Sequence, residues 1–343
     1  MSIPPRIVRR LVIAPLVLFV TFLAITTLPL WLFLGLIATP FVPGRWRVFR
    51  LLATALVYLV YESIGIILLT VLWAASGFGA RMKSDSMQEK HYELMRWFLT
   101  GMYRVGVRLF KLEIELDMPE AGLDLSGIHE RPLLVFARHG GPGDSFLIAY
   151  GVLVRLRRNA RIVLKDTLRL DPCIDMALGR LPNRFITPNP KAGDDIVAAI
   201  GELAEGMDDR DALIIFPEGG NFTERRRVRA IERLRHKGHH DEADKATLMR
   251  NVLPPRPGGA LAAIGATPVA DIMFVAHTGL DHLDSVVDIW RGIPMDKTLK
   301  VRWWIVGEEE LPEGEEQRID WLFAHWAAID KWIEVNKPAS AQS

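Results

Sequence analysis

Hydrophobic and polar residues follow three patterns along the chain. Residues 11–44 contain no charged residue, and residues 51–75 contain a single one, Glu62. Because about 20 apolar residues are enough for a helix to cross a bilayer, both segments are predicted to form membrane helices. Past residue 84, polar and apolar positions alternate with the periods of helices and strands instead.

Arginines flank the first apolar segment on both sides. They are Arg6, Arg9, Arg10, Arg45, Arg47 and Arg50. Since positive charge favours the cytoplasmic side, we expect this segment to enter the membrane and return at Pro29 as a hairpin. Two full spans and a pair of buried helices in a soluble protein are the alternatives. The segment is too long for the core of a secretory signal peptide. Glu62 would be costly against lipid, so we expect it to face protein or the interface.

The remainder of the chain is predicted to form an α/β domain. Residues 84–107 have the spacing of an amphipathic helix, and strands and helices alternate after it. The predicted strands are 109–116, 133–137, 160–164, 184–187, 212–216, 267–276 and 299–306. The predicted helices are 144–156, 172–179, 194–205, 224–236, 258–265 and 315–335. This order indicates a largely parallel central sheet flanked by helices. We therefore divide the chain into membrane-anchoring helices at 1–84 and an α/β domain at 85–343.

Composition narrows the possible partners. The chain has 343 residues, of which half are hydrophobic, and a net charge of +1. This balance gives no reason to expect nucleic acid as a partner. A single cysteine, Cys173, excludes an intrachain disulfide framework.

The first candidate site lies where a predicted strand ends. Residues 131–145 read R-P-L-L-V-F-A-R-H-G-G-P-G-D-S, so that His139 follows the strand and Asp144 begins the next helix. A glycine-rich turn between them can bring the carboxylate back to the imidazole. A histidine held in one tautomer by a carboxylate is a candidate general base. The alternative is a structural histidine at the end of a strand.

The same spacing of histidine and aspartate occurs three more times. These pairs are His236 and Asp241, His239 and Asp244, and His325 and Asp330. They lie in charged or helical stretches, where residues five apart occupy different faces of a helix. We therefore expect only His139 and Asp144 to interact.

A second motif follows the strand predicted at 212–216. Residues 216–223 read F-P-E-G-G-N-F-T, and the helix after them is strongly basic. Its cations are Arg225, Arg226, Arg227, Arg229, Arg233, Arg235 and Lys237. Glycines beside a helix N-terminus, with arginines nearby, can bind a phosphate. The alternative is a solvated basic face, or one that rests on anionic lipid.

Together the two motifs resemble the glycerolipid acyltransferase family, which includes the 1-acylglycerol-3-phosphate O-acyltransferases. That family has a His-x4-Asp block followed by a Phe-Pro-Glu-Gly block at a similar distance. The resemblance covers roughly residues 110–331. Its further matches are Lys165 with Pro172, Arg184-Phe185-Ile186, the segment 253–259 (L-P-P-R-P-G-G), and Thr267-Pro268-Val269. The chain departs from the family at three places. Arg138 stands where asparagine is usual, Gly220-Asn221 where Thr-Arg is usual, and Thr187-Pro188 where the middle block usually ends in arginine.

The resemblance implies transfer of a fatty acyl group from acyl-CoA or acyl carrier protein to a lysophospholipid hydroxyl, most directly that of 1-acylglycerol-3-phosphate. His139 would be the base and Asp144 its orienting carboxylate. The substrate-binding candidates are Arg138, Lys165, Arg184, Glu218, Gly219, Gly220, Asn221, Arg225 and Arg256. Arg225 or Arg256 would supply the charge that Asn221 lacks. Neither a metal nor a cofactor is needed beyond the acyl co-substrate. The partners would be membrane lipids of the plasma or inner membrane, with the α/β domain on the cytoplasmic side.

Two other classes remain open. Arg138-His139-Gly140 also resembles the Arg-His-Gly motif of the histidine phosphatases, in which the histidine is phosphorylated. A non-catalytic lipid-binding relative with the same fold is the other possibility.

Overall fold

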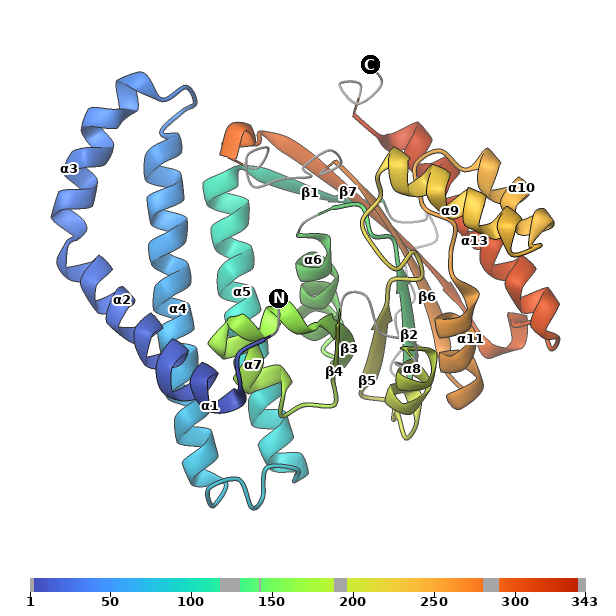
Figure 1. Cartoon of the computed structure of the whole chain (residues 1–343), viewed down its shortest axis with the longest axis horizontal. Coiled ribbons are helices and arrows are strands. Elements are labelled where there is room, and N and C mark those ends of the chain that lie inside the picture. The colour runs from blue at the N-terminus through green and yellow to red at the C-terminus, as the bar shows by residue number, and fades with distance from the viewer. Residues whose placement is uncertain (1–2, 118–129, 142, 188–195, 280–289, 339–343) are drawn as a thin grey trace.

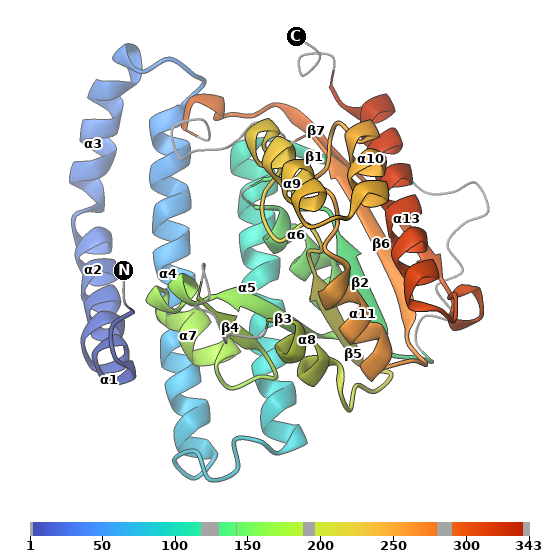
Figure 2. The ribbon, with the colours of Figure 1, turned by 45° about the vertical axis from the view of Figure 1, so that its right-hand side comes forward.

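A seven-stranded sheet lies between two layers of helices, and the N-terminal helices lie outside one of these layers (Figures 1 and 2). The structure is a computed structural model that describes residues 3–117, 130–141, 143–187, 196–279 and 290–338. The strands are β1 (Leu112–Leu116), β2 (Leu133–Ala137), β3 (Asn159–Lys165), β4 (Arg184–Ile186), β5 (Asp211–Ile215), β6 (Asp271–Thr278) and β7 (Lys297–Val306). The predicted α/β class is confirmed.

The sheet has the strand order β1-β7-β6-β2-β5-β3-β4. The five strands from β6 to β4 are parallel to one another, whereas β7 runs antiparallel to β6 and pairs in parallel with β1. Every residue of β2 and β5 is buried, as expected when helices cover both faces of a parallel sheet. The carboxyl ends of β2, β5 and β6 therefore meet at one edge.

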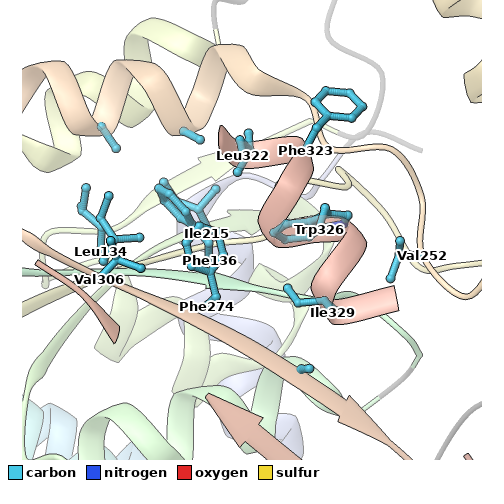
Figure 3. Close-up of a cluster of buried hydrophobic side chains, with 14 of the residues drawn as sticks. Leu134, Phe136, Ile215, Val252, Phe274, Val306, Leu322, Phe323, Trp326 and Ile329 are labelled. Carbon is cyan, nitrogen blue, oxygen red and sulfur yellow. The ribbon is translucent and has the colours of Figure 1, made fainter. Parts of the chain in front are cut away.

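One face of the sheet is covered by α8 (Ile196–Ala204), α9 (Glu224–His236), α10 (His240–Leu248), α11 (Pro257–Ala266) and α13 (Glu315–Asn336). Leu134 and Phe136 of β2 point into this layer, together with Phe274 of β6. Figure 3 shows these side chains to one side of Trp326 of α13, whose ring is fully buried. This cluster forms the larger of the two cores.

The other face is covered by α4 (Arg47–Ala75), α5 (Asp85–Phe110), α6 (Asp144–Tyr150) with its π-helical extension Gly151–Arg155, and α7 (Pro172–Leu178). Leu133, Val135 and Ala137 of β2 point into this second core. The alternation along β2 thus divides its side chains between two layers, because successive residues of a strand face opposite sides of the sheet.

The N-terminal segment does not turn back at Pro29, so the predicted hairpin at that residue is wrong. The segment forms a short helical lead of α1 (Arg6–Val8) and the π-helical Arg9–Ile13, then α2 (Ala14–Thr26) and α3 (Leu28–Ala38). Only Thr27 separates α2 from α3, and Pro29 occupies the first turn of α3, where its missing N–H costs no hydrogen bond. The chain reverses later, at residues 42–46, and α4 then runs back along α2 and α3 (Figure 1).

Two helical segments, Arg6–Thr26 and Arg47–Ala75, are long and apolar enough to cross a membrane by length and composition. In their most apolar windows only 17% and 22% of the residues are buried, which argues against a pair of soluble core helices. Glu62 in α4 is buried, and its Oε1 accepts a hydrogen bond from the Cys173 N–H at 2.7 Å. The expectation that Glu62 faces protein is confirmed.

Several boundaries differ from the sequence-based prediction. Helix α5 continues to Phe110, so the strand predicted from residue 109 begins only at Leu112. The residues Thr267-Pro268-Val269 form a turn before β6 instead of belonging to it, with the Ala270 N–H bonded to the Thr267 carbonyl at 3.1 Å. Helix α10 was not predicted. The start of the helix predicted at Asp194 lies outside the described residues.

Candidate active site

His139 and Asp144 lie at the carboxyl edge of the sheet, immediately after β2. The turn between them passes through Gly143, whose φ of +100° favours glycine, and Asp144 is the first residue of α6. This path brings Asp144 Oδ2 to 2.9 Å from His139 Nδ1. The structure therefore brings together the two residues that the sequence singled out.

The Asp144 carboxylate is buried and well supplied with donors. Its Oδ2 also accepts from the Gly141 N–H at 3.1 Å, and its Oδ1 accepts from the Ser145 N–H at 2.6 Å. Burial alone would raise the pKa of Asp144, but the His139 hydrogen bond, the nearby His277 and the Gly141 amide together hold that pKa below its ordinary value. Asp144 is consequently ionised at neutral pH.

An ionised Asp144 fixes the tautomer of His139. Nδ1 must carry the proton that it donates to the carboxylate, which leaves the lone pair on Nε2. Within the described part of the chain, Nε2 has no hydrogen-bond partner. The His139 side chain is 14% exposed, and its ring lies 4.6 Å from the ring of Phe216. His139 can therefore accept a proton from a ligand at this edge of the sheet.

Glu218 connects three segments around this pair. It is fully buried, and its Oε1 and Oε2 accept from the N–H groups of His139 and Leu253, both at 3.1 Å. The Phe222 N–H in turn donates to the His139 carbonyl at 2.8 Å. Burial raises the pKa of Glu218 to about 8, against the lowering effect of the Arg138 charge and the two amides. Glu218 holds the backbone of His139 in place, a role that differs from the substrate contact predicted for it.

Arg138 also has a structural role. Its side chain is buried, with Nη1 donating to the His277 carbonyl at 2.8 Å and Nη2 to the Asn251 carbonyl at 2.9 Å. The guanidinium lies under Gly140, where an added Cβ would come within 2.5 Å of Nη1. Arg138 is expected from the sequence to bind substrate, whereas in the structure its long side chain crosses inward from β2 to bond the main chain of two other segments.

Gly219 and Arg256 form a second feature beside the pair. Gly219 has a φ of +68°, and an added Cβ would lie 2.9 Å from the Arg256 guanidinium carbon. The Arg256 N–H donates to the Pro217 carbonyl at 2.9 Å, which fixes this contact. The side chain of Arg256 is exposed and has no hydrogen-bond or ion-pair partner among residues 3–117, 130–141, 143–187, 196–279 and 290–338. Partial burial and the charge of Arg233 lower the pKa of Arg256. Arg256 is therefore a cation available to an anionic ligand.

The other predicted binding residues differ in how far they lie from the His139–Asp144 pair. Gly220 and Asn221 continue the turn after β5, and the Asn221 carbonyl accepts from Arg226 Nη1 at 3.0 Å. Arg225 is exposed in the first turn of α9. Lys165 and Arg184 are exposed on β3 and β4, and β5 lies between these strands and β2. Among the residues that the structure describes, neither Lys165 nor Arg184 contacts His139.

The three other His-x4-Asp pairs do not form, as predicted. In α13, Asp330 Oδ1 accepts the N–H groups of Arg250 and Asn251, while His325 bonds the Trp321 carbonyl. His239 pairs instead with Glu242 at 3.2 Å. No interaction joins His236 to Asp241 in the described part of the chain.

One residue of the site was missed in the sequence. His277 is buried near the end of β6, its Nε2 donates to the Arg138 carbonyl at 3.1 Å, and the same nitrogen lies 3.7 Å from Asp144 Oδ2. His277 belongs to none of the sequence motifs described above. The signal was its place directly after the apolar run 272–276, which predicts the strand beside β2.

The described residues hold no group of three or more histidine, cysteine or acidic side chains arranged to bind a metal. Cys173 is buried, and burial raises the pKa of its thiol, which leaves it a poor nucleophile. A polar cleft of about 540 Å³ lies at the opposite, amino-terminal edge of the sheet beside Tyr92, Arg161 and Asp211. Arg161 and Asp211 pair with each other at 2.6 Å, so this cleft shows none of the features of the His139 site.

Comparisons with known proteins add one finding. No family model and no curated protein sequence matches the chain. The structure is similar to the crystal structure of the 1-acyl-sn-glycerophosphate (LPA) acyltransferase PlsC from Thermotoga maritima, with a TM-score of 0.40 and 17% identity over 80% of this chain and 95% of that chain. A TM-score of this size does not establish a shared fold.

Proposed function

We propose that this protein is a membrane-associated acyltransferase, which moves a fatty acyl group from a thioester to the hydroxyl of a lysophospholipid. The observation that carries this proposal is the His139–Asp144 pair, in which a buried, ionised carboxylate holds an imidazole with Nε2 open. Lysophosphatidic acid is the acceptor that the family resemblance favours. The donor is acyl-CoA or acyl carrier protein.

In the proposed reaction, His139 Nε2 takes the proton of the lipid hydroxyl while the hydroxyl oxygen attacks the thioester carbonyl carbon. The charge of Asp144 stabilises the imidazolium that forms. The tetrahedral oxyanion then collapses, an ester bond remains, and the carbon–sulfur bond breaks. The leaving thiolate takes the proton back from His139, so the enzyme returns to its starting state.

The oxyanion needs donors that are not already bonded. The Gly141 amide is committed to Asp144, and the Gly219 amide to the Phe216 carbonyl. The amides of Gly140 and Gly220 have no partner among the described residues, and they belong to the two turns that meet at His139. We assign them as the candidate oxyanion donors.

Two further features support a phospholipid as the acceptor. Arg256 offers an unpaired guanidinium beside Gly219, and a guanidinium can bind a phosphate through two parallel hydrogen bonds. Helices α2 and α3 expose many large apolar side chains, among them Leu16, Phe19, Phe22, Leu30, Trp31, Phe33 and Leu36. Such a surface suits a bilayer, in which a lysophospholipid resides.

The structure gives less support to a histidine phosphatase. In that reaction Arg138 would have to bind the phosphate, but its guanidinium is buried and bonded to the carbonyls of His277 and Asn251. A non-catalytic lipid-binding protein would have no need of an oriented His139 with Nε2 open.

The test is an assay of the full-length protein in lipid nanodiscs with palmitoyl-CoA and lysophosphatidic acid. We expect thiol release to match the phosphatidic acid detected by mass spectrometry. Phosphate release without acyl transfer would favour the phosphatase alternative. The absence of both reactions, over a panel of lysophospholipids and both acyl donors, would contradict the proposed function.

A further inference from the structure

Helix α9 presents an unpartnered basic surface on its outer side. Arg225, Arg229, Arg233 and Lys237 are spaced four residues apart, so they lie along one side of the helix, and all four are exposed. We call these four residues the basic stripe. From Arg225 to Lys237 it extends about 18 Å along the helix, at 1.5 Å per residue.

The side chains of the basic stripe do not bond to the rest of the described fold. Ile231, on the other side of α9, is buried in the core, and Arg227 is bonded to the Met249 and Thr247 carbonyls. By contrast, no residue of the stripe has a side-chain hydrogen bond or ion pair with any described residue. Glu232 is an acidic neighbour on the exposed side, and it does not balance four cations. A run of unpaired cations creates a positive field that attracts polyanions.

The stripe leads to the candidate active site. The charge of Arg233 is close enough to lower the pKa of Arg256, and Arg256 lies against Gly219. The neighbouring residue, Glu218, accepts the His139 N–H. Positive charge therefore continues from the exterior of α9 to the turn beside His139, which indicates a partner whose reactive group must reach that histidine.

The position of the stripe argues against a membrane surface as this partner. Helix α9 packs in the core on one face of the sheet, whereas α4, against which α2 and α3 lie, packs in the core on the other face. Figure 1 shows α9 and the exposed helices α2 and α3 towards opposite ends of the molecule's longest axis, and in Figure 2 α9 comes to the front while α2 and α3 stay on the left. Helix α9 therefore lies on the face of the sheet away from α2 and α3, the helices that the proposed function places in a bilayer. A row of four exposed side chains suits a protein surface better than a small ligand enclosed in a pocket.

We infer that the basic stripe is the docking surface for an acidic, water-soluble protein that carries the acyl group as a thioester. This inference rests on the proposed function, and it selects acyl carrier protein over acyl-CoA as the donor that the surface recognises. Charge complementarity of this kind accelerates encounter and sets register more than it adds to affinity. The contact should consequently weaken as salt rises.

The test uses the full-length protein in zwitterionic nanodiscs, with lysophosphatidic acid as acceptor. The variant is Arg229→Glu/Arg233→Glu, and the matched control is Arg104→Glu/Arg108→Glu, which makes the same charge change at two exposed arginines of α5. We expect the variant to lower kcat/KM for palmitoyl-loaded acyl carrier protein by about 10-fold or more, and for palmitoyl-CoA by less than about 2-fold. The control should leave the ratio between the two donors unchanged.

A binding measurement separates this inference from the proposed function. Interferometry without acceptor should detect the loaded carrier protein on the wild-type protein at low salt, with about 10-fold weaker binding to the variant. If neither donor supports acyl transfer, the proposed function fails. The binding measurement alone then tests whether the basic stripe docks the carrier protein. Equal binding to both proteins, or no binding, would overturn the docking surface. So would loss of anionic vesicle or RNA binding in the variant without an effect on the carrier protein.

Discussion

The turn after β2 and helix α13 both contain a histidine followed five residues later by an aspartate, yet only the turn joins the two side chains. In the turn, Gly143 lets the chain reverse, so that Asp144 returns to His139 at 2.9 Å. In α13, the helix directs His325 toward the Trp321 carbonyl and Asp330 toward the amides of residues 250 and 251. A motif thus acquires chemistry from the backbone path between its residues, and its spacing alone predicts little.

The strongest test of this difference is the histidine itself. Replacing His139 by alanine removes the proposed base, so we expect kcat for acyl transfer to fall by about 100-fold or more. His236→Ala, at an exposed position with the same spacing to an aspartate, should leave kcat within about 2-fold of wild type. Circular dichroism would check that both variants are folded. Near-normal turnover in folded His139→Ala would refute the assignment of His139 as the general base.

The two aspartates should separate catalysis from stability. Asp144→Asn removes the charge that orients His139, and we expect kcat to fall by about 100-fold. Asp330→Asn keeps the shape but weakens the bonds to the amides of residues 250 and 251, so it should cost about 1–3 kcal/mol of unfolding free energy. Its turnover should remain close to wild type. Equal catalytic losses in the two variants would mean that Asp144 has only a structural role.

Arg256 tests the anion site at the second turn. If its guanidinium binds the acceptor phosphate, Arg256→Ala should raise KM for lysophosphatidic acid by about 10-fold or more and change KM for palmitoyl-CoA little, as expected for a charged hydrogen bond. Arg225→Ala tests the neighbouring cation in the same way, and Asn221→Arg should be tolerated. No effect of either alanine variant on lysophosphatidic acid would direct the search to acceptors without a free phosphate.

The effect of Glu218 should be visible in the pH dependence of stability. Its pKa in the folded protein, about 8, lies above the ordinary value of 4.5, so the folded state holds this proton more tightly than the unfolded state. Its contribution to stability is therefore full below about pH 4.5 and is lost as the pH rises toward 8, with a slope of up to about 1.4 kcal/mol per pH unit. The melting temperature of the wild type minus that of Glu218→Gln, followed from pH 5 to 8, should fall. A difference that stays constant with pH would contradict this view of Glu218.

The local part of this structure could be predicted from the sequence. The bounds of β2 and α9 agree with the prediction because an apolar run defines the first, and Thr223 caps the second by accepting the Arg226 N–H. The meeting of His139 and Asp144 was also local, since five residues and a glycine turn decide it. The antiparallel direction of β7 was not predictable, because the alternation of helices and strands favours parallel neighbours.

The long-range part could not be predicted. Arg138 bonds residues 251 and 277, more than a hundred positions away, so its inward direction leaves no trace in the local pattern. The direction of the Glu218 side chain likewise leaves no trace in the local pattern, because its two oxygens join His139 to Leu253. Both residues were expected to bind substrate because their motifs lie beside the reactive histidine. Their actual partners are main-chain groups that only the fold brings near.

The contacts of α7 have a consequence for how a lipid reaches the site. Asp175 pairs with Arg9 at 2.8 Å, Asp171 accepts from the Tyr58 hydroxyl, and the Cys173 amide is bonded to Glu62. Three polar contacts at one short helix thus fix the N-terminal lead and α4 to the sheet domain. In this stretch of the described chain, no flexible linker separates the N-terminal helices from that domain. With these helices in a bilayer, His139 would stand at a constant height above it. Lateral diffusion of the lipid, followed by its partial withdrawal from the leaflet, would then have to cover the remaining distance.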